Sequence, residues 1–223
     1  MEISEIENKI INADCMDILK KLPDKSVDLV LTDPPYGIGF GTFNRTNKLK
    51  NGQRVKANKY KNSDWDSAIP DTEIFNEMRR VSKNQVVWGG NYFPELWKDG
   101  GRCFVFWKKN NPCKNFGAGE LAWTSFDENC KCYDYNYYGN IEGGGIAEQK
   151  IHPTQKPVAI MERCLQDFSK EGQLILDCFS GSGTTAIACH RLKRRFICIE
   201  KDPEYWAASV KRLEDEQRQG VLF

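Results

Sequence analysis

The chain has 223 residues, which suggests one or two domains, and we expect a single domain over residues 1–223. With 40% apolar and 28% charged residues it can bury a core, so global disorder is excluded. Its 32 basic and 31 acidic residues give a net charge of +1, which neither requires nor excludes a nucleic-acid partner. No apolar run approaches the ~18 residues of a membrane span, and the first residues are acidic where a secretory signal would be basic. We therefore expect a cytoplasmic protein.

The nine cysteines are an odd number and, without an export signal, indicate reduced thiols. Those in apolar stretches are predicted to be small core residues, namely Cys164, Cys178, Cys189 and Cys198. The remaining candidates for a zinc site, Cys103, Cys113, Cys130 and Cys132, lack the spacing of paired C-x-x-C motifs. We expect no metal site.

The first half of the chain is predicted to alternate strands and helices. A buried strand over residues 27–31 must stop at Pro34 and Pro35, because proline cannot donate to a sheet. Periodicity vanishes over residues 39–64, and a helix then opens at Pro70–Asp71. The other elements predicted here are a strand at 9–12, a helix from 16 to about 22, and strands at 85–88, 103–107 and 121–124.

The second half continues this alternation after an interruption. Residues 127–150 are rich in Tyr, Asn and Gly and are predicted to be irregular. Helices are predicted from Pro157 to a stop at Gly172, over residues 184–192, and from Asp202–Pro203 to about residue 217, with strands at 174–178 and 196–199. The pattern predicts an α/β fold, an open and mainly parallel twisted sheet with helices on both faces.

A glycine-rich segment joins the predicted strand at 174–178 to the next helix. Gly181 and Gly183 let the backbone pass close to a ligand, and the helix N-terminus offers unpaired N–H groups to an anion. Glu200 ends the following strand, where a carboxylate can accept hydrogen bonds from both ribose hydroxyls. This pattern indicates an adenosine-containing cofactor, and a tight turn without a ligand is the alternative. Only 23 residues follow Glu200, too few for the second half of a dinucleotide site.

A second motif, Asp33-Pro34-Pro35-Tyr36, follows the predicted strand at 27–31. Functional groups of open α/β sheets collect at the carboxyl ends of the strands. Because the glycine-rich segment has the equivalent position after another strand, the two motifs are expected at the same edge. The pair is much more specific than either motif alone.

Together these motifs make the chain similar to a known family. The segment Asp177–Thr185 resembles the S-adenosylmethionine loop of DNA amino-methyltransferases. With Asp33–Tyr36 ahead of this loop, nearly the whole chain resembles the N6-adenine/N4-cytosine DNA methyltransferase family in its permuted arrangement. Further segments similar to the family are Asn12–Leu19 with Ser26–Leu29, and His152–Pro157.

The resemblance implies S-adenosylmethionine as the methyl donor. Asp14 would bind the adenine amine of this cofactor, and Thr154 and Lys156 would lie near its methionine end. For His152, a structural hydrogen-bonding role is favoured over a catalytic one. The predicted cofactor-binding residues are Asp14, Cys15, Thr154, Lys156, Asp177, Phe179, Gly181, Ser182, Gly183, Thr184, Thr185 and Glu200.

The chemistry of an exocyclic amine explains the first motif. The lone pair of such an amine is delocalised into the base, so it is a poor nucleophile. The Asp33 carboxylate and the Pro34 carbonyl can each accept one N–H, and both would stabilise the positive charge that develops on nitrogen. Pro34 and Pro35 fix the backbone, and Tyr36 would stack on a base rotated out of the duplex. No covalent step, and so no catalytic cysteine, is required.

A basic run follows the Asp33–Tyr36 motif and could reach DNA phosphates, although a solvated loop is the alternative. Between residues 45 and 61 it holds Arg45, Lys48, Lys50, Arg54, Lys56, Lys59 and Lys61 and no acid. The tyrosines at 133–138 could stack on bases or simply cover the core. No separate recognition domain is evident, which argues against strong sequence specificity.

The main prediction is therefore methylation of adenine N6 in double-stranded DNA, with a homodimer plausible by resemblance. Asp at position 33 favours adenine over the N4 of cytosine. The alternatives are methylation of cytosine N4, of RNA or of a protein amide, and a binding protein without activity. The intact motifs argue against the last of these.

Overall fold

The computed structural model describes residues 2–39, 66–98, 100–110, 117–138, 141–142, 145–146 and 150–219. Its main sheet has eight strands in the order β1-β11-β10-β2-β3-β5-β4-β6. From β1 to β3 all neighbours are parallel, β5 is antiparallel to β3 and β4, and β6 is parallel to β4. The strands are β1 (Lys9–Asn12), β2 (Val27–Thr32), β3 (Ser82–Trp88), β4 (Phe104–Lys108), β5 (Gly119–Thr124), β6 (Lys131–Asp134), β10 (Leu174–Asp177) and β11 (Arg195–Glu200).

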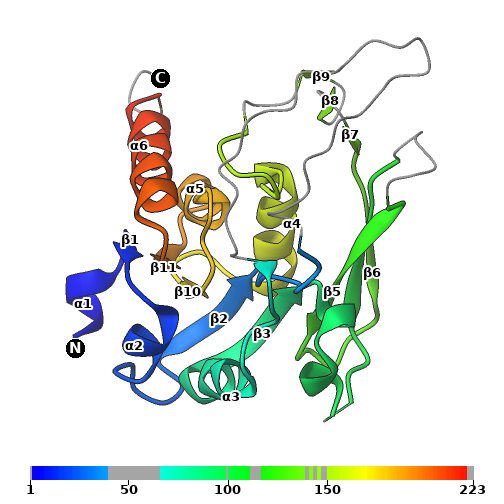
Figure 1. Cartoon of the computed structure of the whole chain (residues 1–223), viewed down its shortest axis with the longest axis horizontal. Helices are drawn as coiled ribbons and strands as arrows, with labels where there is room; N and C mark the ends of the chain where they lie inside the picture. The colour runs from blue at the N-terminus through cyan, green and yellow to red at the C-terminus, as the bar shows by residue number, and fades with distance from the viewer. Residues whose placement is uncertain are drawn as a thin grey trace.

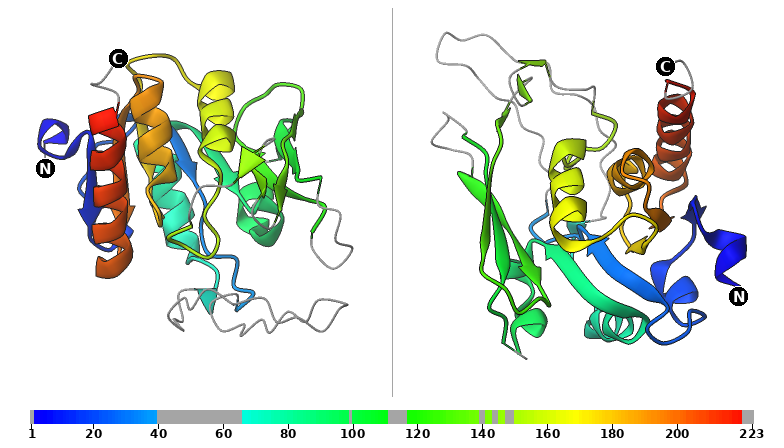
Figure 2. Two further views of the ribbon diagram at one scale, coloured as in Figure 1. Left: turned by 90° about the horizontal axis from the view of Figure 1, so that it is seen from above. Right: turned by 180° about the vertical axis from the view of Figure 1, so that it is seen from behind.

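Helices cover both faces of this sheet (Figure 1). One face is covered by α4 (Val158–Phe168), α5 (Thr184–Arg191) and α6 (Pro203–Gln219), and the other by α2 (Cys15–Leu19) and α3 (Thr72–Val81). The view from behind in Figure 2 shows the same division. The predicted open, mainly parallel α/β fold is confirmed. Among the described helices, none combines the length and apolar character that crossing a bilayer requires.

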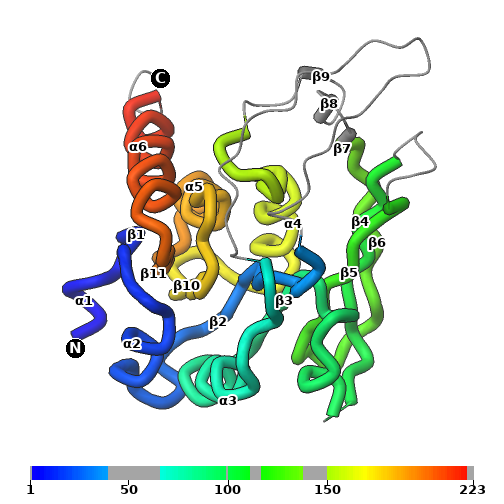
Figure 3. The backbone as a smooth tube through the Cα atoms, viewed as in Figure 1, coloured from blue at the N-terminus to red at the C-terminus, as the bar shows by residue number. Residues whose placement is uncertain are grey.

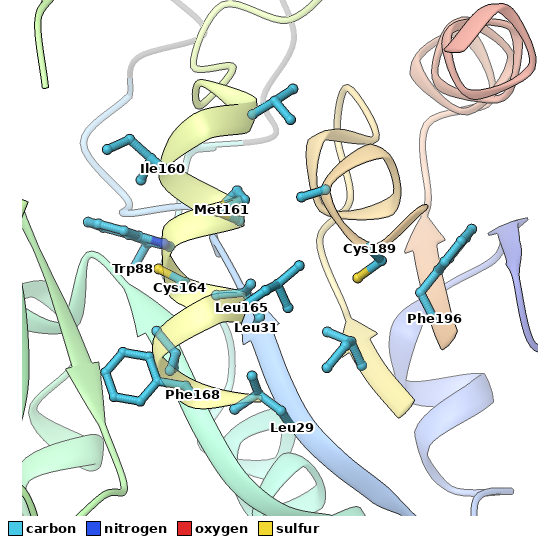
Figure 4. Close-up of a cluster of buried hydrophobic side chains, with 14 of the residues drawn as sticks. Leu29, Leu31, Trp88, Ile160, Met161, Cys164, Leu165, Phe168, Cys189 and Phe196 are labelled. Carbon is cyan, nitrogen blue, oxygen red and sulfur yellow. The ribbon is translucent and has the colours of Figure 1, made fainter. Parts of the chain in front are cut away.

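The core consists of two apolar layers, one on each side of the sheet. The central strands are buried on both faces, as the apolar runs of β2 and β10 require. In Figure 4, α4 carries Met161 and Leu165 into one layer, between Trp88 of β3 and Cys189 of α5. Each fully buried apolar side chain of this size contributes about 1.5–3 kcal/mol. The cysteines predicted for the core are indeed buried, namely Cys164, Cys178, Cys189 and Cys198.

Residues 127–150 differ from the prediction of an irregular segment. Residues 131–134 form β6 on the edge of the main sheet, and β7 (Tyr137–Tyr138), β8 (Ile141–Glu142) and β9 (Gly145–Ile146) form a small antiparallel sheet. The burial of β6 alternates with a period of two, but only Tyr133 faces the core, so the apolar signal is too short to be recognised. Figure 3 shows β4, β5 and β6 side by side at this end of the sheet.

Smaller differences concern the ends of helices. The helix predicted to begin at Met16 spans Cys15–Leu19, and the helix starting after Pro157 ends at Phe168, before Gly172. Short helical segments that were not predicted are α1 (Ile3–Ile6), η3 (Gly90–Tyr92) and η4 (Pro94–Trp97). None of these differences moves the carboxyl ends of the parallel strands.

Candidate active site

The Asp33–Tyr36 turn leaves the carboxyl end of β2 as predicted. The carboxylate of Asp66, a residue that is only 2% exposed, stabilises this turn by hydrogen bonds to its backbone. Its Oδ1 accepts hydrogen bonds from the backbone N–H groups of Tyr36 (2.7 Å) and Gly37 (2.9 Å). This role of Asp66 could not be predicted from the sequence, because the residue lies just after the segment 39–64, which has no periodicity.

The ring of Tyr36 is fixed by aromatic neighbours and by a glycine. It stacks on Tyr92 with ring centroids 4.7 Å apart and an interplanar angle of 12°, and Phe93 meets it edge-on. Gly89, at the end of β3, has a φ of +70°, and a Cβ there would lie 2.1 Å from Cε1 of Tyr36. Only glycine therefore allows the tyrosine ring this close to β3.

The hydroxyl of Tyr36 donates to Oδ1 of Asp33 at 2.7 Å. Oδ2 of Asp33 lies 2.6 Å from Nζ of Lys156, which also lies 3.0 Å from Oε2 of Glu120 and donates to the Tyr36 hydroxyl at 3.1 Å. Burial raises the pKa of Asp33 above its usual value, against the opposing effect of Lys156. Burial likewise raises the pKa of Tyr36, with the charge of Asp33 acting in the same direction.

The cofactor loop lies between β10 and α5 on the neighbouring strand, as predicted. The buried carboxylate of Asp177 stabilises the loop through three hydrogen bonds. It accepts from the hydroxyls of Thr32 (2.7 Å) and Thr185 (2.6 Å) and from the Phe179 N–H (3.0 Å). Burial raises the pKa of Asp177 to about 6, although these donors oppose the shift. Both oxygens of Asp177 are thus engaged by protein donors.

Glu200 reaches the loop from the end of β11. Its Oε2 accepts from the Gly181 N–H at 2.7 Å, and its Oε1 accepts from the Asp202 N–H at 2.8 Å. Burial raises the pKa of Glu200, and the two N–H groups oppose this effect. Glu200 therefore fixes the loop, and each carboxylate oxygen retains a lone pair for a ligand.

The shape of the loop depends on Gly183. Its φ is +75°, and a Cβ would lie 3.0 Å from Cβ of Ser209 and 3.3 Å from Cδ1 of Ile10. Arg212 on α6 also anchors the loop, donating to the Ser182 carbonyl (3.0 Å) and the Thr184 hydroxyl (3.2 Å). Sequence reasoning missed Arg212, whose only signal is its place one helical turn after Ser209.

The other predicted cofactor residues line the same edge. Asp14 caps α2 by accepting from the Met16 N–H at 3.0 Å, and its Oδ2 lies 2.8 Å from Nζ of Lys201. Cys15 is buried beside it, and burial raises the pKa of this thiol to about 11.

His152 and Thr154 lie on the opposite side of the loop. Nδ1 of His152 is 3.1 Å from the Thr154 hydroxyl, and the imidazole packs edge-on against Tyr205 with centroids 4.4 Å apart. A Cβ on Gly181 would be 3.8 Å from this ring. Burial lowers the pKa of His152 to about 4, so the imidazole is neutral at physiological pH.

Two contacts join the Asp33 turn to the cofactor loop. Thr32, just before the turn, donates to Asp177 beneath the loop. Lys156 links the two directly, because its Nζ binds Asp33 while its backbone carbonyl accepts from the Thr184 hydroxyl at 3.2 Å. The two predicted motifs are therefore one site.

The predicted DNA-binding residues, all between Arg45 and Lys61, lie outside the described residues. Among the tyrosines that could stack on bases, those whose side chains the structure describes contact the protein. The hydroxyl of Tyr133 donates to Asp167 at 2.6 Å, and that of Tyr137 donates to the Gln155 carbonyl at 2.9 Å. Their rings pack on the core, which favours the covering role.

An open α/β sheet that gathers a glycine-rich loop, a carboxylate at the end of the next strand and a polar turn at its carboxyl edge has the arrangement of a cofactor-binding site. The family model described as DNA methylase matches residues 108–211. The type II methyltransferase M2.DpnII of Streptococcus pneumoniae is 29% identical over 93% of this chain and 90% of its own length. The type II methyltransferase M2.LlaDCHI of Lactococcus lactis subsp. cremoris is 28% identical over 97% and 93% of the two chains.

Solved structures of DNA methyltransferases share the fold of this chain. The M1.HpyAVI–SAM complex superposes with a TM-score of 0.57 at 25% identity, over 92% of this chain and 99% of that chain. The cytosine-N4-specific PvuII DNA methyltransferase shares the fold, with a TM-score of 0.58 at 16% identity over 95% and 91%. The family model and the two relatives support the N6/N4 DNA methyltransferase family for this chain, with S-adenosylmethionine as the methyl donor.

Proposed function

We propose that this enzyme transfers a methyl group from S-adenosylmethionine to the exocyclic N6 of adenine in double-stranded DNA. The observation that carries the proposal is the Lys156 link, which holds a charged acceptor and a glycine-rich cofactor loop within one site. A group-transfer reaction requires this proximity of acceptor and donor.

The residues present fit the cofactor. The positive-φ glycines of the loop at the start of α5 allow close backbone approach, and Glu200, which already accepts from the Gly181 N–H, retains carboxylate lone pairs for ribose hydroxyls. Asp14, Cys15, Phe179, Ser182 and the other predicted loop residues would surround it. Asp177 would act through the loop, since its oxygens are taken by Thr32, Thr185 and Phe179. When bound, S-adenosylmethionine supplies an electrophilic methyl group on a positively charged sulfur.

The Asp33 turn would prepare the amine. The Asp33 carboxylate and the Pro34 carbonyl would each accept one N–H of N6, which frees the nitrogen lone pair to take the methyl group; one N–H proton would then pass to the Asp33 carboxylate or to water. The carboxylate can accept the N–H while bound by Tyr36 and Lys156, because its two oxygens have about four acceptor sites in total. Tyr36 would face the target base, which must leave the duplex to expose its amine.

The basic run from Arg45 to Lys61 follows the Asp33 turn in the sequence, and its side chains would contact DNA phosphates. By family resemblance we also propose a homodimer, which light scattering of the purified chain would test. A molar mass of one chain at the protein concentrations used in the activity assays would contradict the proposed homodimer.

Mass spectrometry of nucleosides tests the reaction. The enzyme would be incubated with isotope-labelled S-adenosylmethionine and unmethylated plasmid DNA, with RNA in a parallel reaction. We expect labelled N6-methyladenine from the DNA. Labelled N4-methylcytosine would instead support the cytosine alternative, and label in RNA alone would contradict a DNA substrate.

A further inference from the structure

Glu120 is a partly buried charge beside the site, with a side chain 25% exposed, and it has no role in the proposed mechanism. It lies near the start of β5, which runs antiparallel to β3 with Ala122 opposite Trp88. This register carries the start of β5 past the carboxyl end of β3, to the edge where Asp33 leaves β2. Lys109, just after β4, is held beside it by a hydrogen bond from its N–H to the Ala118 carbonyl (3.0 Å).

Four charges alternate along this edge in the order Lys109, Glu120, Lys156, Asp33. The Lys109 ammonium pairs with Oε1 of Glu120, and Oε2 of Glu120 lies 3.0 Å from Nζ of Lys156. The Lys156 side chain is only 6% exposed. Two cations and two carboxylates leave the cluster neutral, which is the condition for keeping such charges out of water.

The Lys156 ammonium has two carboxylate ion-pair partners and one hydroxyl hydrogen-bond acceptor. These are Asp33 at 2.6 Å, Glu120 at 3.0 Å and the Tyr36 hydroxyl at 3.1 Å. The ammonium of Lys156 is therefore shared between two carboxylates, and Asp33 neutralises only part of its charge. Without Glu120, the buried ammonium would be neutralised by Asp33 alone, and that carboxylate would become a weaker acceptor for another N–H.

We infer that Glu120 is a positioning residue for methyl transfer, sharing the Lys156 ammonium with Asp33 so that Asp33 remains a strong acceptor for the target amine. This inference rests on the proposed function. Among the described residues, the charged partners of the Glu120 carboxylate are Lys109 and Lys156, so its proposed effect on Asp33 is exerted through Lys156.

The electrostatics give this role a distinct signature. Burial alone would raise the pKa of Glu120, but the charges of Lys156 and Lys109 lower it to about 2. The Glu120 carboxylate is therefore ionised at every pH at which the enzyme would be assayed. Its negative charge raises the pKa of both Asp33 and Lys156. The charge of Glu120 also raises the pKa of Tyr36, and it pairs with Lys109. The other titratable groups that face this cluster are Tyr92, Cys164, His152 and Asp177.

The test is the pH dependence of kcat in E120Q, which keeps the shape of the side chain and removes its charge. With saturating cofactor and plasmid DNA, kcat should fall about 10- to 100-fold, the scale of a small misplacement at a reacting centre. The acidic limb, set by Asp33, and the alkaline limb, set by Lys156, should both move to lower pH, because the charge of Glu120 raises the pKa of both groups. Cofactor affinity and KM for DNA should change little. E216Q, which breaks a surface pair with Arg191, is the matched control and should resemble the wild type.

A folded E120Q enzyme with a wild-type kcat and pH profile would overturn the inference. So would a lower kcat with an unmoved profile, which would mark a purely structural role. If E120Q does not fold, K109Q/E120Q removes one charge of each sign and carries the same test. Failure of the proposed function itself would be visible separately, as absence of N6-methyladenine in the wild-type reaction.

Discussion

At the scale of single residues, Asp33 combines burial, an ion pair and a tyrosine hydroxyl on one carboxylate. The short run Asp33–Tyr36 therefore specifies chemistry only because Lys156, Gly89 and Asp66 hold it from three other parts of the chain. The motif could be recognised from the sequence, whereas Glu120 and Asp66 could not. A lone acid in a strand or loop has no spacing pattern that distinguishes it from a solvated one.

The first prediction concerns Asp33→Ala. Removing the acceptor should lower the rate of methyl transfer at least ~100-fold, the scale for losing one preorganised polar group. Cofactor affinity should change little, because no described contact joins Asp33 to the loop except through Lys156. Single-turnover kinetics measure the rate, and a near-normal rate would refute the role of Asp33. A thermal melt is needed beside it, because Lys156 then keeps only Glu120 as a carboxylate partner.

The second prediction concerns Glu200→Ala. Its carboxylate fixes the Gly181 and Asp202 N–H groups and is proposed to bind ribose, so its loss should weaken cofactor binding first. Charged hydrogen bonds contribute about 1.5–3 kcal/mol each, which corresponds to at least roughly a tenfold loss of affinity. Calorimetric titration with S-adenosylmethionine measures it. E200Q, which retains one acceptor oxygen, should lose less, and unchanged affinity in E200A would exclude the assignment.

At the scale of elements, the strands and helices that build the cofactor edge were predictable because their periodicity is strong. β2 and β10 are apolar runs bounded by turn residues, and α3 begins at the Asp71 cap expected from Pro70–Asp71. Strand β6 was missed because one buried tyrosine in four residues is not a pattern. The direction of β5, which brings Glu120 to the site, depends on long-range pairing that no local signal encodes.

The third prediction concerns the basic segment. Neutralising Lys48, Lys50, Lys56 and Lys59 together should weaken DNA binding about equally for all sequences, since phosphates carry no base information. Each true phosphate contact should reduce the slope of log affinity against log salt by about 0.9, so four contacts would change it by roughly 3 to 4. A salt titration of duplex binding measures this, with cofactor affinity as the internal control. An unchanged slope would contradict phosphate contacts by these lysines and would support the alternative hypothesis of a solvated loop.

At the scale of the whole molecule, the pH dependence of stability should reflect His152. Burial lowers its pKa from 6.5 to about 4, so the folded protein binds fewer protons than the unfolded chain between these values. The stability contribution of the neutral imidazole is complete above about pH 6.5 and is lost as the pH falls toward 4. It amounts to at most about 3 kcal/mol.

Urea unfolding at pH 7.5 and pH 4.5 checks this fourth prediction. In H152Q, which has no titrating group at this position, the stability difference between the two pH values should shrink. An equal difference in the two proteins would show that His152 is accessible to protons in the folded state. Buried carboxylates such as Asp177 contribute equally to both proteins and cancel in the comparison.

The central claim is that the Asp33 turn and the cofactor loop form one site that acts on adenine N6. The most direct test is the structure of the enzyme bound to duplex DNA and a non-reactive analogue of S-adenosylmethionine. We predict an adenine rotated out of the duplex, with N6 within about 3.2 Å of the Asp33 carboxylate and the Pro34 carbonyl. The analogue should lie on Gly181–Gly183, on the opposite side of N6 from Glu120. A target base whose amine faces away from Asp33, or an analogue bound away from this loop, would contradict the account.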